Sequence, residues 1–123
     1  MVVPYQGNDV QLTSLIIDQP MTADFSTISF DMQFFDMLSI QAVWVGANKT
    51  TAKIIPQSSI DNINWCNLVS ESDAKRVDAA AGCQMYGFDI YPHPRFRVFF
   101  EKKTNSTGTI SIHVFAKRQR VPK

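Results

Sequence analysis

Histidine suits acid–base chemistry near neutral pH, and the sequence contains two, His93 and His113. His93 stands between prolines in Tyr91-Pro92-His93-Pro94, which predicts an extended connector, and His113 falls on the outward or edge side of an alternating run. Neither belongs to a nucleophile or metal motif such as G-x-S-x-G or H-E-x-x-H. We therefore expect no catalytic residues and no enzyme activity. A small β-sandwich hydrolase stays open as an alternative, and it needs one imidazole to meet an acid in a pocket.

The spacing of possible metal ligands predicts no metal site. Cys66 and Cys83 could pair, but no segment typical of a secretion signal precedes them, so we expect two reduced thiols that act as small hydrophobic side chains. The stretch Asp61-Asn62-Ile63-Asn64 alternates oxygen ligands as a calcium loop does, but it lacks the glycine and the closing glutamate of such loops. An Asx turn explains it better. We expect no metal, no cofactor and no small-molecule substrate.

Residues 57–68 combine turn residues with aromatic and aliphatic ones. Asp61 and Asn62 are predicted to form the turn, after which Trp65 and Leu68 fold back, with Trp65 closing one end of the sandwich. The functional alternative is an exposed tryptophan that stacks on sugar. A carbohydrate-binding or host-adhesion module would need Trp65, Trp44 or Tyr91 at the surface.

The length of 123 residues indicates a single domain over 1–123, with one core. Charged residues make up 19% and hydrophobic residues 45%, a composition that excludes a disordered chain or a nucleic-acid-binding tail. Nine phenylalanines with so little charge suggest buried protein–protein surface. No apolar run is long enough to span a membrane as a helix, so we expect no membrane partner.

The dominant hydrophobic period is two, which is typical of β-strands. Phe96, Val98 and Phe100 alternate with more polar neighbours, as do Ile110, Ile112 and Val114, and we predict that both rows face the core. The polar stretch between them ends in Gly108, which predicts a central hairpin with Gly108 at a positive φ. Further strands are predicted over 10–17, 26–34, 38–45, 51–57 and 84–90.

The strands over 38–45 and 51–57 are predicted to form a second hairpin, and Pro56 is expected at an edge or a bulge. Residues 70–82 show no apolar face at helical spacing, so we predict a loop with at most a short turn. The fold class is therefore all-β: an antiparallel, jelly-roll-like β-sandwich of about seven to eight short strands.

Three segments carry a resemblance to a known family: 39–46, the pattern Gln57-x-Ser59-x-Asp61-Asn62-x-Asn64-Trp65-x-x-Leu68, and 95–100 together with 106–112. They resemble a β-sandwich family common among structural proteins of tailed bacteriophages, and the resemblance covers roughly residues 28–118. It implies a virion component of the head-fibre, capsid-decoration or tail-associated type. Asn62 stands where the family usually has glycine, and Cys66 and the 70–82 insertion also depart from the pattern.

The charge is lopsided although the net charge is only +1. Residues 1–62 hold six acids and two bases, a net −4, whereas residues 63–123 hold ten bases and five acids, a net +5. An N-terminal arm (about 1–9) and a basic tail (about 118–123) are expected to leave the sandwich. We predict a homo-oligomer that binds other virion proteins rather than nucleic acid, assembled in the host cytoplasm and located in the virion. The assembly candidates are Val2, Val3, Tyr5, Lys117, Arg118, Arg120 and Lys123.

Overall fold

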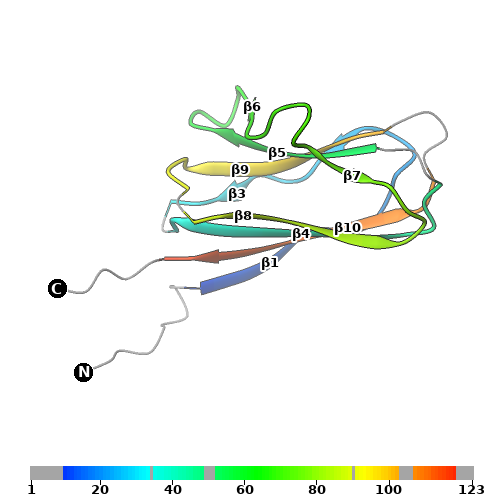
Figure 1. The fold of residues 1–123 in the computed structure, drawn as a ribbon. Coiled ribbons are helices and arrows are strands. Elements are labelled where there is room, and N and C mark those ends of the chain that lie inside the picture. Colours follow the sequence, from blue (N-terminus) through cyan, green and yellow to red (C-terminus); the bar gives the residue numbers. More distant parts are fainter. Residues whose placement is uncertain (1–9, 34, 49–51, 90, 103–106, 119–123) are drawn as a thin grey trace.

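The computed structural model describes residues 10–118 except 34, 49–51, 90 and 103–106. The described residues form ten strands in two antiparallel sheets that pack face to face, which confirms the predicted sandwich (Figure 1). In chain order they are β1 (Val10–Pro20), β2 (Phe25–Ser26), β3 (Phe30–Asp31), β4 (Met37–Val45), β5 (Ala52–Ser59), β6 (Cys66–Asn67), β7 (Lys75–Val77), β8 (Gly82–Phe88), β9 (Arg95–Glu101) and β10 (Thr109–Lys117). Among these described residues, no helix is long and apolar enough to cross a membrane.

The first sheet, here sheet A, has the strand order β1-β10-β4-β8. The second, sheet B, has the order β2-β9-β5-β6, with β3 also paired to β9 and β7 also paired to β5. Figure 1 shows the two layers, with β5 and β9 above β4 and β10. Each sheet therefore has one inner face that the other sheet covers.

The inner faces meet in one hydrophobic core. Phe96, Val98 and Phe100 enter it from sheet B, and the row Ile110, Ile112 and Val114 enters it from sheet A, as predicted. All six side chains are at most 1% exposed. Burying a side chain of this size contributes about 1.5–3 kcal/mol, so these alternating rows drive the sheets together.

Neither predicted hairpin exists. β9 and β10 lie in different sheets, and so do β4 and β5. The alternating pattern correctly predicts which side chains face the core, but a strand that crosses to the opposite sheet buries the same side chains as one that turns back beside its neighbour. The 96–117 segment is therefore a crossover between the sheets and not a central hairpin.

Four such crossovers gather at one end of the sandwich: β1 to β2, β4 to β5, β7 to β8 and β9 to β10. Gly108, the predicted positive-φ residue, has a φ of 91° and lies among them. A Cβ on Gly108 would collide with the backbone of Val45, Gly46 and Ala47 in the neighbouring crossover, so only glycine fits there.

Backbone and side-chain hydrogen bonds tie these crossovers to one another. The Met21 N–H donates to the Gly108 carbonyl (2.9 Å), and the Ala47 N–H donates to the Ala80 carbonyl (2.9 Å). The Thr107 hydroxyl donates to the Gly46 carbonyl (2.9 Å), and the Asn48 side chain accepts from the Thr107 N–H (3.1 Å). The crossovers thus close this end of the sandwich through hydrogen bonds to one another.

The strand count exceeds the prediction because several strands are very short. The predicted strand at 26–34 is two strands of two residues, β2 and β3, and the predicted loop at 70–82 contains β7. Pro56 lies between the residues of β5 that pair with β7 and those that pair with β6. The Pro56 carbonyl accepts from the Leu68 N–H (2.9 Å). Because Pro56 lies between the two pairings, its lack of an N–H removes no hydrogen bond from either of them.

A buried tyrosine joins the two sheets by hydrogen bonds as well as by packing. The Tyr86 hydroxyl on β8 donates to the Ile54 carbonyl on β5 and accepts from the Lys75 N–H on β7, both at 2.6 Å. Burial raises the pKa of Tyr86, so the hydroxyl keeps its proton through the neutral range. One side chain of sheet A therefore satisfies two backbone groups of sheet B.

We expect Tyr86→Phe to lower the free energy of unfolding by about 1–3 kcal/mol, because it leaves a buried carbonyl and a partly buried N–H without a partner. Urea denaturation at neutral pH measures the loss. Tyr91→Phe is the matched control: its hydroxyl bonds to one backbone group, the Arg95 carbonyl (3.0 Å), and its other partner is the Ser58 side chain. An equal or larger loss in the control would contradict the assigned role of Tyr86.

Candidate interaction surface

Side chains without a formal charge form most of the outer face of sheet A. The strand register sets them in rows across the sheet. We call this set the uncharged face: Leu12, Ser14, Ser39, Gln41, Val43, Val45, Cys83, Met85, Gly87, Thr109, Ser111, His113 and Phe115. From strand spacing and rise, its projected area is on the order of 400 Å².

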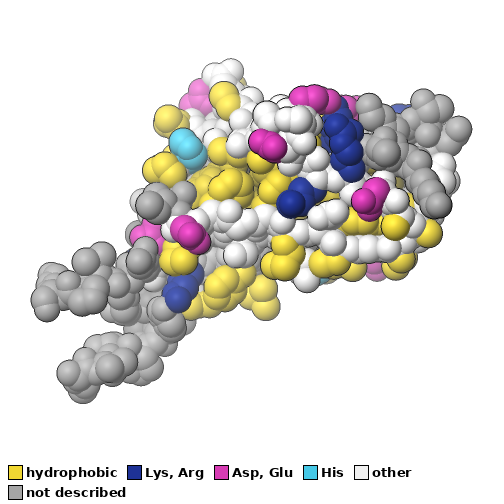
Figure 2. Space-filling view, viewed as in Figure 1, with side chains coloured by type: hydrophobic (Ala, Val, Ile, Leu, Met, Phe, Trp, Pro, Cys, Tyr) yellow, Lys and Arg dark blue, Asp and Glu magenta, His cyan; other side chains and the backbone are white. Residues whose placement is uncertain are grey.

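Several large apolar side chains on this face are open to solvent. Leu12 is 77% exposed, Met85 54% and Phe115 41%. Figure 2 shows hydrophobic side chains along the lower margin of the molecule, where sheet A lies in the same view. A shallow groove of about 130 Å³ runs between Leu12, Met85 and Phe115. Exposed apolar side chains that gather on one face in this way often belong to an interaction site.

Three of the polar side chains on this face, Ser14, Ser111 and His113, are paired within the sheet, and charged residues lie at its rim. Ser14 Oγ lies 2.9 Å from His113 Nδ1, which places His113 outward on β10 and next to a hydroxyl instead of an acid. Asp18 lies beside Ser111 at one corner, and Lys117 ends the row opposite Val10. A partner on this face would meet few charges that must be stripped of water.

The outer face of sheet B is different, because the chain covers it. The Arg97 guanidinium stacks on the Trp65 ring, 4.4 Å from its centre, and Arg97 Nε donates to Gln57 Oε1 (2.7 Å). Gln57 in turn donates to the side chain of Asn67 (2.8 Å). Trp65 is therefore half-buried on this outer face and does not close one end of the sandwich as predicted, because a guanidinium offers its ring a planar partner there.

A buried lysine lies on the same sheet. Lys53 is 5% exposed and forms ion pairs with Glu71 and with Glu101, whose Oε1 lies 3.5 Å from Lys53 Nζ. Glu71 belongs to the segment after β6, so the ion pair holds this segment over β5. Lys53, Arg97 and Glu101 of sheet B therefore make their charged contacts within the chain.

The predicted Asx turn forms at the end of β5. Asp61 Oδ1 accepts hydrogen bonds from the Ile63 and Asn64 N–H groups (2.9 and 2.8 Å) and from the Ser59 hydroxyl (3.0 Å). Asn62 has a φ of 62°, the left-handed conformation for which asparagine or glycine is favoured. These backbone hydrogen bonds hold the pKa of Asp61 well below its ordinary value.

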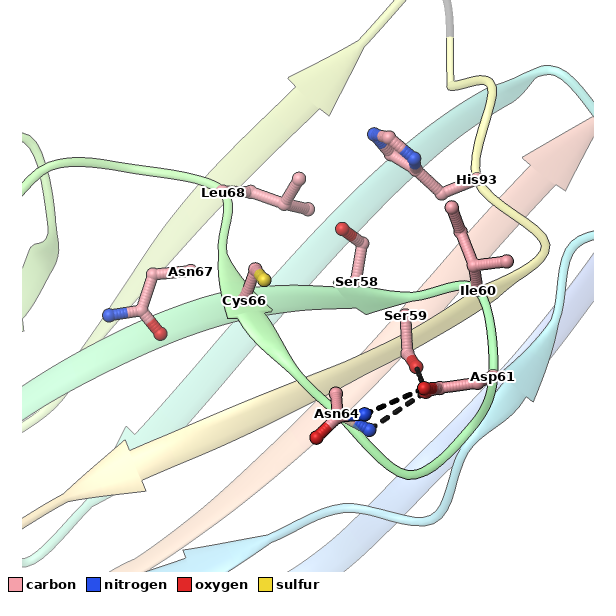
Figure 3. Close-up of a pocket in the computed structure, with 9 residues that line it drawn as sticks. All are labelled: Ser58, Ser59, Ile60, Asp61, Asn64, Cys66, Asn67, Leu68 and His93. Carbon is pink, nitrogen blue, oxygen red and sulfur yellow. Dashed lines mark hydrogen bonds between the residues drawn. The ribbon is translucent and has the colours of Figure 1, made fainter.

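An open hollow of about 420 Å³ lies beside this turn (Figure 3). Its wall includes His93 and Cys66 together with Asp61. The Asp61 carboxylate points to Ser59 and Asn64 in Figure 3, and the His93 ring lies away from it. His93 makes an edge-on contact with the Tyr91 ring (5.4 Å between centres). Asp61 and His93 thus share a hollow without forming an acid–base pair.

Two of the three aromatic residues considered for sugar stacking are buried. Trp44 is 2% exposed and donates its Nε1–H to the Ala79 carbonyl (3.0 Å), and Tyr91 is 3% exposed. Cys66 and Cys83 are free thiols, in line with the expectation that they do not pair, but both are exposed and neither packs in the core as a small hydrophobic side chain. Among the described residues, no three His, Cys, Asp or Glu side chains form a group that could hold a metal ion.

The predicted assembly residues lie at the ends of the chain. Lys117 is the last residue of β10, where its carbonyl accepts from the Asp36 N–H (3.1 Å), and Arg118 borders a hollow with Asp36. Val2, Val3, Tyr5, Arg120 and Lys123 lie outside the described residues. The sequence prediction missed Leu12, Met85 and Phe115, although the lack of charge at outward positions of 38–45 and 109–116 was a usable signal.

No protein-family model matches the chain, and no curated protein matches it. Among solved structures, it is similar to the SPBc2 prophage-derived protein YomS, with a TM-score of 0.54 and 17% identity over 94% of this chain and 97% of that one. A structure described as FLHE aligns with a TM-score of 0.42 and 11% identity over 89% of this chain and 95% of that one. The likeness to YomS shows a shared fold.

We expect Asp61→Asn to destabilise the protein at neutral pH and to have less effect in acid. The folded state holds the pKa of Asp61 below its ordinary value of 3.8, so the stability from the ionised carboxylate is present above that value and is lost as the pH falls below it. Urea denaturation from pH 7 to about pH 2 compares the two proteins. A difference in unfolding free energy that stays constant across this range would contradict the assignment.

Proposed function

We propose that this protein is a non-enzymatic structural component of a bacteriophage particle, of the capsid-decoration, head-fibre or tail-associated type. It acts by binding copies of itself and other virion proteins. The observation that carries the proposal is the uncharged face, where Leu12, Met85 and Phe115 stand open to solvent. The fold shared with a prophage-derived protein and the resemblance of the 57–68 segment to phage β-sandwich proteins support the setting.

The two outer faces support an assembly role by their contrast. Trp65 and the segment that carries Glu71 lie over sheet B, where they contact Arg97 and Lys53. Sheet A has no comparable cover among the described residues. Apolar groups left in water gain about 25 cal/mol for each Å² that a partner covers, so the uncharged face is the surface with most to gain from assembly.

The carbohydrate-binding alternative receives less support from the geometry. Sugar platforms need an open aromatic face, and Trp44 and Tyr91 are both buried. Trp65 is half-buried and holds a guanidinium against its ring. The proposal therefore places the protein in the virion, assembled in the host cytoplasm, without a cofactor or a small-molecule substrate.

The test is incorporation into phage particles produced in cells that carry this gene with an epitope tag. Density-purified particles are expected to contain the tagged protein in constant ratio to the major capsid protein, as measured by quantitative mass spectrometry. A double variant, Leu12→Lys with Phe115→Lys, should lower this ratio at least about tenfold, because two ammonium groups would have to lose water in an apolar contact.

Ile28→Lys is the matched control, since Ile28 is 66% exposed but lies outside the uncharged face. Its incorporation should equal that of the wild type. Both proteins should unfold within about 0.5 kcal/mol of the wild type, as expected of surface substitutions. Particles that lack the wild-type protein, or that take up the double variant fully, would refute the proposal.

A further inference from the structure

The open edges of the two sheets differ in how well they are protected against pairing with another chain. Edge strands expose unpaired N–H and C=O groups, and proteins guard them with short strands, bulges, charges or proline. Sheet B has only short strands at its margins: β2, β3 and β6 have two residues each, and β7 has three. These strands are too short to pair stably with a second chain.

β1, at one edge of sheet A, carries several of these guards. Its register against β10 shifts twice, between Ser14 and Ile16 and again before Gln19. Asp18 has a φ of 50°, which bends the strand, and the strand ends in Pro20. A second chain could not run in regular register along such an edge.

β8, at the other edge of sheet A, carries none of these guards. Its seven residues, Gly82–Phe88, pair with β4 in unbroken register. The strand contains no charged residue and no proline. Met85 is exposed on its outer side, and nothing lies within 4 Å of the position that a Cβ on Gly87 would take. It is the one long strand edge, among those described, that is ready to accept a partner.

We propose that β8 pairs antiparallel with β8 of a second copy, which joins two copies of sheet A into one eight-stranded sheet. The inference deepens the proposed function, because it names the surface that makes the protein a homo-oligomer. Pairing of all seven residues fixes a single register, with the two-fold axis at Met85. Such an interface is isologous, so one strand supplies both sides of it.

The strand is complementary to itself in this register. Gly82 lies opposite Phe88 of the second copy, and Cys83 lies opposite Gly87, so each glycine faces a larger side chain. Met85 meets Met85 on the outer side, and no like charges oppose each other along the strand. Lys75 is the charged group that leans over Tyr86, with Nζ 5.6 Å from the ring centre, and it belongs to β7 on the inner side of the sheet.

A disulfide across the seam tests the register. In a Cys66→Ser background, Gly87→Cys would face the native Cys83 of the second copy at a Cα separation of about 4.5–5.5 Å, within reach of a disulfide. Within one chain the same two residues lie about 13 Å apart along the strand and cannot bridge. Mild oxidation should therefore convert most of the Gly87→Cys protein to a covalent dimer on a non-reducing gel.

Two control proteins accompany it. The Cys66→Ser parent should stay uncrosslinked, because its two Cys83 residues would be about 13 Å apart along the seam. Leu12→Cys in the same background places an equally accessible thiol on β1 and should stay monomeric on the gel. Covalent dimers of either control in equal yield would overturn the proposed register.

Sedimentation of the purified protein, without particles, tests the dimer itself. The wild type should sediment at twice 13.9 kDa. Met85→Lys sets two ammonium groups face to face and should weaken dimerisation at least about tenfold, whereas Met85→Leu should preserve it. A monomeric wild type would overturn the inference. A dimer that dissociates in the Leu12→Lys variant and gives no crosslink in the Gly87→Cys variant would also overturn the inference. Such a dimer would be formed by two uncharged faces stacked on each other.

These results are independent of particle incorporation. A β8 dimer that is absent from particles would refute the proposed function and leave the edge pairing standing. Incorporation of a strictly monomeric protein into particles would overturn the edge pairing and leave the role as a particle component standing.

Discussion

The four crossovers at one end of the sandwich constrain the rest of the structure. β4 and β10 are neighbours in sheet A, and β5 and β9 are neighbours in sheet B. The crossover from β4 to β5 and the crossover from β9 to β10 therefore pass between the two sheets next to each other. This leaves no room for a side chain where Gly108 meets the backbone around Gly46. Thr107 and Asn48 then satisfy the polar groups of these crossovers within the chain itself.

Once the crossovers set the two layers, the remaining faces take different environments. The inner faces bury their alternating rows, and the Tyr86 hydroxyl adds a polar link between the layers. Sheet B is covered on the outside by the segment that follows β5, which is pinned through Lys53 and Arg97. Sheet A keeps its outer face open. The two outer faces therefore differ because the segment that follows β5 lies over sheet B and not over sheet A.

The sequence predicts the sandwich and its core well, because period-2 alternation directly reports which side of a strand is buried. Phe96 and Ile110 face the core as expected. Alternation does not report which strand lies alongside, so the two hairpins were wrong: a crossover buries the same residues as a turn. β7 was missed because three residues are too few to show a period.

Local chemistry was predictable where the partners are close in sequence and not where they are distant. The Asp61 turn is built from residues at most three positions apart, and the prediction matches the hydrogen bonds observed. The stacking of Arg97 on Trp65 joins residues that are 32 positions apart in the sequence, and no local sequence pattern predicts it. The uncharged face is likewise assembled from four strands, so only its lack of charge was visible beforehand.

The strand order also determines when the protein can acquire its structure during synthesis. β10 is the last of the ten described strands in chain order, yet it lies between β1 and β4 in the middle of sheet A. Within sheet A, β1 pairs with β10 alone, so β1 has no partner in its sheet until residues 109–117 have been synthesised. Folding therefore depends mainly on contacts between distant parts of the chain, and a topology of this kind folds more slowly than one built from local contacts.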